Sequence, residues 1–173
     1  MAEDGCLEVR SHAVGESYWP ERSDALGGGV FRTLDLAEIS EEFLYLRGRA
    51  SDRINVAGRK VSPEAIERVL GQHPAVRECL VFGVPSTEMG RGEMIVACVA
   101  PGAALAPEMV REFLVSRLPS WQVPREWWFL ETLAVNDRGK LSRAEWRARY
   151  AAWQSGTVGG SNGPTRLNGF SPA

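Results

Sequence analysis

The 173-residue sequence is short of cysteine and of long apolar runs. Its three cysteines, Cys6, Cys79 and Cys98, form neither an even disulfide set nor the spacing of a metal site, which favours a reducing, cytoplasmic setting. No run approaches the roughly 18 apolar residues that a membrane-spanning helix needs, and the first residues lack the basic-then-apolar pattern of an export signal. We therefore expect no metal site and no membrane contact.

Net charge is also scarce. The 20 basic residues nearly balance the 22 acidic ones and leave a net charge of -2, so no strong field attracts a polyanion. The basic residues are scattered singly, which disfavours a nucleic-acid-binding protein. With 44% hydrophobic residues, the chain can still bury a core of ordinary size. These numbers indicate a globular protein whose partners are not nucleic acids.

The local patterns divide the chain into three parts. Residues 1–48 alternate short strand-like pieces, CLEVRS and FLYLRGR, with glycine-rich or polar turns, and need not form a complete sheet by themselves. Residues 49–153 contain regular helix and strand signals. Residues 154–173 are rich in glycine, serine and asparagine, and we expect this tail to be disordered.

The middle part predicts a small α+β domain. Two amphipathic helices begin with a proline, and the Ser62 hydroxyl is the expected N-cap of the first; Ser142 is the N-cap expected for a third helix. Largely apolar runs between the helices predict three strands. The expected helices and strands are a helix from Ser62 to before Pro74, strands at 76–84 and 93–101, a helix at 106–119, a strand at 125–133 and a helix at 142–153. They imply a three-stranded sheet covered by helices.

Three stretches combine glycine with fixed charge: 31-FRTLDL-36, 48-GRASDRINVAGRKVSPEAIE-67 and 136-NDRGKLSR-143. Each alone is more typical of a turn than of a site. In this order, with VRECLVFGVP and LPSWQVPREWWFLETL between the last two, they resemble the C-terminal part of the AMP-forming acyl-CoA synthetase and adenylate-forming ligase superfamily. The resemblance runs from about Gly5 to Tyr150.

The resemblance implies an assignment for each part of the chain. Residues 1–48 would be the last strands of a large adenylation domain, and residues 49–153 a mobile C-terminal domain. The family implies ATP with Mg²⁺ and coenzyme A as substrates, a small-molecule carboxylic acid, and no bound cofactor in this chain. The large N-terminal adenylation domain would be the partner, in the same parent chain or a separate one.

Lys140 matches the catalytic lysine of this family. Adenylation brings two anions together and expels a third, so a cation touching both would speed the reaction by several orders of magnitude. Gly139 permits a tight turn, and a lysine stem can carry a point charge into a site made by another domain. The alternative is an exposed surface lysine before a helix.

The resemblance suggests further site residues in the two other stretches. Asp35 matches the acid that holds the ribose hydroxyls, and Arg49 a second nucleotide contact; a solvent-facing charge is the alternative for either. Lys60 lies where some relatives carry a phosphate-reaching cation, and a turn charge is nearly as good an interpretation. Gly58 would leave room for the pantetheine arm, or would be a plain turn glycine. Ser51 occupies the hinge position.

Several features depart from the family pattern. The usual T-G-D reads Thr33-Leu34-Asp35, the hinge carries serine in place of Asp or Lys, and Ala134 or Val135 replaces a proline before the lysine motif. No Ser/Thr/Gly-rich phosphate loop is present. The chain alone is therefore expected to lack activity, and its status as an enzyme stays open.

A stand-alone binding module with the same fold is the competing hypothesis. Such a module would dock on a ligase or on a carrier protein, and the T-L-D and hinge residues weakly favour it. Under this hypothesis Trp127 or Trp128 would contact the partner, and Lys140 would have no role.

Overall fold

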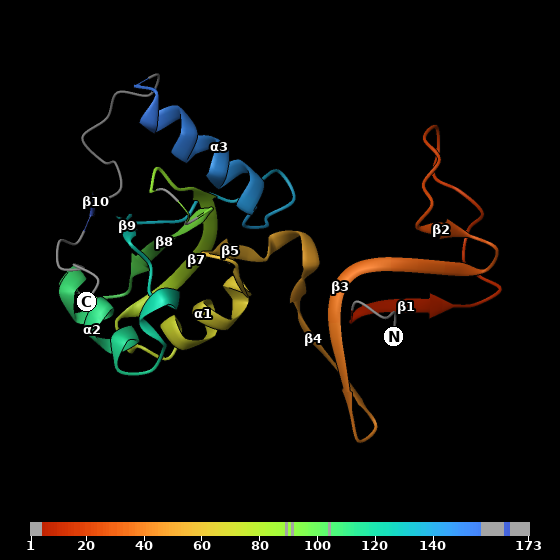
Figure 1. Cartoon of the computed structure of the whole chain (residues 1–173), viewed down its shortest axis with the longest axis horizontal. Helices are drawn as coiled ribbons and strands as arrows, with labels where there is room; N and C mark the ends of the chain where they lie inside the picture. The colour runs from red at the N-terminus through yellow and green to blue at the C-terminus, as the bar shows by residue number, and fades with distance from the viewer. Residues whose placement is uncertain (1–4, 89, 91, 104, 157–164, 167–173) are drawn as a thin grey trace. The chain divides into compact units, whose positions relative to one another are not determined.

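A computed structural model describes residues 5–88, 90, 92–103, 105–156 and 165–166. The chain forms two compact units, Met1–Ser51 and Asp52–Ala173, hereafter unit 1 and unit 2 (Figure 1). Each has its own secondary structure, and each is described by itself.

Unit 1 is an antiparallel arrangement built on one long strand. Its elements are β1 (Cys6–Arg10), β2 (Leu26–Gly27), β3 (Val30–Ser40), β4 (Phe43–Arg49) and the 3₁₀ helix η1 (Ala50–Asp52), which ends in unit 2. The first part of β3 pairs with β1 and β2, and the rest pairs with β4. The turn between β3 and β4 has only two residues, and Glu41 there has a positive φ of 57°, which suits a tight hairpin.

Unit 2 combines a small hairpin with a larger sheet and three helices. Its elements are β5 (Ile54–Val56), β6 (Arg59–Val61), α1 (Pro63–Leu70), β7 (Val76–Pro85), β8 (Glu93–Pro101), α2 (Pro107–Val115), the 3₁₀ helix η2 (Ser120–Gln122), β9 (Glu126–Phe129), α3 (Arg143–Gln154) and β10 (Thr165–Arg166). The sheet order is β10-β9-β8-β7, with β8 and β9 parallel and the other pairs antiparallel.

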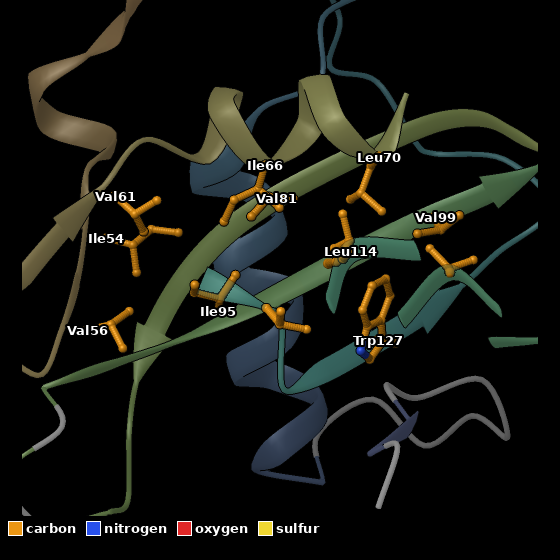
Figure 2. Packing of buried hydrophobic residues seen from close by; sticks show 13 residues of the cluster. Ile54, Val56, Val61, Ile66, Leu70, Val81, Ile95, Val99, Leu114 and Trp127 are labelled. Carbon is orange, nitrogen blue, oxygen red and sulfur yellow. The ribbon is translucent and has the colours of Figure 1, made fainter. Parts of the chain in front are cut away.

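Successive side chains along the strands point to opposite faces of this sheet, and both faces are buried. Val81, Ile95 and Trp127 point to one face, where they pack with side chains of α1 and α2 (Figure 2). Phe82 and Trp128 point to the other face, where they pack with side chains of α3. The predicted α+β fold with a helix-covered sheet is therefore confirmed, because a strand with two apolar faces needs cover on both.

Two local expectations differ from the structure. The hydroxyl of Ser62 donates to the Glu64 carboxylate at 2.6 Å and makes no capping bond with the helix backbone. Ser142 does cap α3, since its hydroxyl accepts from the Glu145 amide. The third predicted strand, 125–133, is shorter than expected because β9 pairs with β8 only along Val96–Val99 before the chain turns away towards α3.

The C-terminal tail contains one paired segment. Thr165 and Arg166 form β10, which pairs with Trp127 and Glu126 of β9. Disorder was expected throughout 154–173, and at these two residues the structure differs, because strand pairing satisfies the backbone groups along the edge of β9. The expectation for 157–164 and 167–173 lies outside the described residues. No helix in the described part of the chain is long and apolar enough to cross a membrane.

Candidate functional site

Lys140 lies at the end of a loop that Asn136 closes. The Asn136 amide N–H donates to the Lys140 carbonyl at 2.9 Å, and the Gly139 amide donates to the Asn136 carbonyl at 2.8 Å. The Asn136 side-chain oxygen accepts from the amides of Arg138 and Lys140, at 3.0 and 2.9 Å. Gly139 has a φ of +70°, where glycine is unstrained. The backbone under Lys140 is thus fixed, while its side chain is exposed.

The base of this loop is tied to the rest of unit 2 by Arg143, the first residue of α3. Its guanidinium donates to both carboxylate oxygens of Glu67, at 2.9 and 2.7 Å, and to Asp52 at 3.2 Å. It also lies 2.9 Å from the Glu64 carboxylate and donates to the Val81 carbonyl at 3.0 Å. Only 16% of the Arg143 side chain is exposed. One cation therefore joins η1, α1, β7 and α3.

Glu67 is the inner member of this cluster. Its carboxylate accepts the Val81 amide N–H at 2.8 Å as well as the Arg143 guanidinium. Burial raises the pKa of Glu67, and the Arg143 charge and the Val81 hydrogen bond oppose this shift without cancelling it. Glu67 and Arg143 together bind the N–H and the C=O of Val81 at the edge of β7, as a further strand would do.

The cluster also holds the residue that follows the predicted hinge. Asp52 comes directly after Ser51 and is the first residue of unit 2. Besides Arg143, it lies 3.9 Å from the Arg147 guanidinium, and Arg147 in turn donates to the Gly83 carbonyl. In the described residues, no group of three or more His, Cys, Asp or Glu side chains is arranged to hold a metal. The carboxylates of Asp52, Glu64 and Glu67 form ion pairs with Arg143, and Asp52 also lies near Arg147.

In unit 1 the structure brings Asp35 and Arg49 together. They are paired residues of β3 and β4, and the Arg49 guanidinium donates to one Asp35 oxygen at 3.0 Å. The Thr33 hydroxyl accepts from the Asp35 amide and donates to the Leu7 carbonyl at 2.8 Å, which fixes the backbone before the carboxylate. A carboxylate has two oxygens, so this contact is compatible with further hydrogen bonding.

Leu34 replaces the glycine of the usual T-G-D pattern without backbone strain. It is a regular residue of β3, outside the set of positive-φ residues, and its side chain is 61% exposed. The substitution therefore changes the surface beside Asp35 and leaves the strand intact.

Gly58 and Lys60 lie on the hairpin of β5 and β6. Ala57 and Gly58 form its turn, with φ values of 51° and 81°, the pattern of a type I′ turn. A Cβ on Gly58 would meet nothing within 4 Å, so the backbone conformation and not crowding within the chain requires glycine. Lys60 pairs with Asn55 across the hairpin, and its side chain is exposed.

The docking role considered for the two adjacent tryptophans is wrong. Trp127 is fully buried and Trp128 is 8% exposed. They lie on opposite faces of the sheet, each within a core cluster, because neighbouring residues of a strand point in opposite directions. Neither presents a surface to a partner.

Sequence reasoning missed Arg143, Asp52 and Asn136 as organising residues. The available signals were local: Arg143 is three residues after Lys140 in N-x-x-G-K-x-x-R, and Asp52 is next to Ser51. Arg143 contacts Glu67, which is 76 positions away in the chain, and Asp52, which is 91 positions away. The periodicity of a sequence does not reveal such long-range contacts.

Comparison with known proteins identifies the class. Residues 65–140 match the AMP-binding enzyme C-terminal domain family. The fatty acid–[acyl-carrier-protein] ligase ScoC of Streptomyces coeruleorubidus is 34% identical over 149 residues, which cover 84% of this chain and 28% of the ligase.

Two solved structures agree with this match. The amide bond synthetase McbA of Marinactinospora thermotolerans gives a TM-score of 0.74 at 32% identity, over 84% of this chain and 31% of that one. The anthranilate CoA ligase AuaEII in complex with anthranoyl-AMP gives 0.71 at 25% identity, over 88% and 31%.

Residues 65–140 therefore belong to the C-terminal domain family of the adenylate-forming ligases. The chain spans less than a third of the length of these three relatives.

Proposed function

We propose that this chain supplies the C-terminal part of an AMP-forming carboxylate ligase and that Lys140 is its catalytic cation. The observation that carries the proposal is the form of the Lys140 loop. Four hydrogen bonds through Asn136 fix its backbone, and Arg143 anchors the helix that follows. A fixed backbone with an exposed lysine is a means of delivering charge to a site outside unit 2.

The proposed first step is adenylation. A carboxylate oxygen of the acid bonds to the α-phosphorus of ATP, the bond from that phosphorus to the bridging oxygen breaks, and pyrophosphate leaves with its Mg²⁺. Lys140 contacts the carboxylate and an α-phosphate oxygen, and so offsets the negative charge that these groups share in the transition state. A loss of about 100-fold on its removal corresponds to about 2.7 kcal/mol.

Asp35 and Arg49 are proposed to hold the nucleotide. The ion pair with Arg49 orients the carboxylate of Asp35. In this proposal that carboxylate accepts hydrogen bonds from the ribose hydroxyls. Lys60 is proposed to reach a phosphate from its exposed place on β6. The phosphate loop is proposed to come from the large N-terminal domain, because this sequence has none, and we propose that the chain alone is inactive.

The second step is proposed to be acyl transfer after rotation about Ser51. The thiol sulfur of the acceptor loses its proton to solvent and bonds to the acyl carbon, the bond from that carbon to the phosphate oxygen breaks, and AMP leaves. The boundary between the two units falls directly after Ser51. A serine at this position leaves the backbone angle φ free to change during a rotation. The pantetheine arm of a thiol acceptor would pass beside Gly58, where the space is open.

The proposal extends to the acceptor of the acyl group and to the cellular setting. The relatives named above include a ligase for a carrier protein, an amide bond synthetase and a CoA ligase, so we propose coenzyme A or a carrier-protein thiol as the acceptor. None of the three cysteines, all within described residues, forms a disulfide, which supports a reducing cytoplasmic setting.

A chimaeric enzyme tests the catalytic role. The 149-residue matching region of the Streptomyces ligase is replaced by this chain, and pyrophosphate release is measured with ATP and a fatty acid. Lys140→Ala is expected to lower the rate at least 100-fold, and Arg138→Ala, which removes a charge from the same loop, to change it less than about twofold. Equal, nonzero rates for the wild type and Lys140→Ala would overturn the proposal.

A further inference from the structure

Asp52 is the first residue of unit 2 and directly follows the proposed hinge at Ser51. Its carboxylate meets two arginines. Oδ2 accepts a hydrogen bond from Arg143 at 3.2 Å, and Oδ1 lies 3.9 Å from the Arg147 guanidinium. Only 19% of the Asp52 side chain is exposed, and solvent ions screen such a partly buried pair much less than a surface pair. Asp52 therefore makes a stronger attachment than an ordinary surface acid.

The two arginines belong to successive turns of one helix. Arg143 and Arg147 are four residues apart in α3, so they lie on the same side of that helix. The Arg143 Nε donates to the Val81 carbonyl at 3.0 Å. The Arg147 Nε donates to the Gly83 carbonyl at 3.2 Å. Two cations thus attach Asp52 and the edge of β7 to the same side of α3.

Both ends of the segment that carries Lys140 are attached to α3. At one end, Lys140 precedes Arg143, the first residue of α3, by three positions. At the other end, the Trp146 indole N–H donates to the Ala134 carbonyl at 3.2 Å. The position of α3 therefore sets the position of the Lys140 backbone within unit 2.

The long, exposed side chain of Lys140 needs a fixed base if it is to reach a defined point in another domain. The bonds of Asn136 are internal to the loop, so they hold its shape and not its place in unit 2. A displacement of about 1 Å can cost on the order of 100-fold in rate. The contact of Asp52 with α3 supplies a reference at the point where the chain enters unit 2.

We propose that Asp52 is a positioning residue for Lys140. Through Arg143 and Arg147 it fixes α3, and with it the Lys140 loop, to the start of unit 2. This proposal rests on the proposed function. Asp52 touches no substrate and acts through Lys140, so the adenylation step is expected to depend on Asp52 and the acyl-transfer step is not.

Removal of charge at two neighbouring positions tests the proposal in the chimaeric enzyme. Asp52→Asn keeps the size of the side chain and removes its charge. It is expected to lower kcat for pyrophosphate–ATP exchange about tenfold, with KM for ATP and for the acid within about twofold. Acyl transfer from a preformed acyl adenylate is expected to stay within about twofold. Arg53→Gln removes the charge of the next residue, which is exposed, and as the matched control should leave both rates within about twofold.

A double variant distinguishes positioning from a purely structural role. If Asp52 acts through Lys140, adding Asp52→Asn to Lys140→Ala lowers the residual exchange rate by less than about twofold, because residues that act as a unit are not additive. A further tenfold loss, or equal losses in both half-reactions, would overturn the proposal. If Lys140→Ala alone leaves exchange unchanged, the proposed function fails and this inference with it. If Lys140→Ala slows exchange and Asp52→Asn does not, this inference alone fails.

A measurement on the full 173-residue chain needs no activity. The Trp146 amide donates to the Ser142 carbonyl at 3.1 Å in the first turn of α3. Its hydrogen exchange is expected to become about fivefold faster in Asp52→Asn and to stay within about twofold in Arg53→Gln. Unchanged exchange in β8 would show that the fold is intact. Unaltered exchange at Trp146 in Asp52→Asn would overturn the proposal.

Discussion

In unit 2, helices lie over both faces of the larger sheet, whereas in unit 1 the hairpin of β3 and β4 has large apolar side chains that are exposed. The arginines differ in the same way. Arg143 in unit 2 is 16% exposed and meets three carboxylates, while Arg49 in unit 1 is 64% exposed and meets one. The apolar side chains on both faces of the larger sheet in unit 2 are covered within that unit, whereas Ile39, Leu44 and Leu46 of unit 1 are exposed.

The largest expected effect comes from the core of unit 2. Trp127→Ala removes a fully buried indole and is expected to lower the free energy of unfolding by about 3–5 kcal/mol. Leu46→Ala in β4 is expected to change the free energy of unfolding by less than about 0.5 kcal/mol, since that side chain is exposed. Urea unfolding followed by far-ultraviolet circular dichroism gives both values. A similar loss for the two variants would remove the contrast between the units.

The two arginines extend the contrast to polar groups. Arg143→Ala leaves the carboxylates of Asp52, Glu64 and Glu67 without their shared cation and is expected to cost about 3 kcal/mol. Arg49→Ala breaks an exposed pair and is expected to cost less than about 1 kcal/mol. The same unfolding experiment measures both. If Arg143→Ala unfolds like the wild type, the cluster does not stabilise unit 2.

A smaller effect is expected within the Lys140 loop. Asn136→Ala removes the side-chain oxygen that binds the Arg138 and Lys140 amides and is expected to cost about 1–2 kcal/mol locally. Hydrogen exchange at the Lys140 amide should become about tenfold faster, while exchange in β7 and β8 stays unchanged. Unaltered exchange at Lys140 would show that Asn136 does not hold the loop.

The last prediction concerns the reactivity of the Cys79 thiol in the folded chain and involves no loss of stability. Burial, with a further contribution from the Glu67 charge, raises the pKa of the Cys79 thiol to about 12. At pH 8 the thiolate that reacts is therefore scarce. Alkylation of Cys79 in the native chain is expected to be at least about 100-fold slower than in urea, as followed by peptide mass mapping. Rapid native labelling would show that unit 2 opens around β7.

The sequence was sufficient for the three helices of unit 2 and for β7, β8 and β9, but not for the short hairpin of β5 and β6. The largely apolar runs 76–84 and 93–101 predict buried strands, and Pro63 and Pro107 mark where helices begin. It was not sufficient for β10, because a pairing of two residues with Trp127 and Glu126 leaves no periodic signal in a glycine-rich tail. The burial of both Trp127 and Trp128 depends on cover from two sides, which local composition does not specify.

The sequence identifies individual residues of the candidate site, but it does not predict how they contact one another. Motif order singles out Lys140, Asp35 and Arg49, and strand pairing explains why the last two meet. The role of Arg143 follows only from the fold, which brings Asp52 and Glu67 to it from distant parts of the chain.

The most direct test of the central claim separates the two half-reactions in the chimaeric enzyme. Adenylation is followed by exchange of labelled pyrophosphate into ATP, and acyl transfer by the release of AMP from a preformed acyl adenylate on addition of the acceptor. If Lys140 is the adenylation cation, Lys140→Ala lowers the exchange rate at least 100-fold and changes the transfer rate less than about threefold. Equal losses in both steps, or no loss in exchange, would contradict the account.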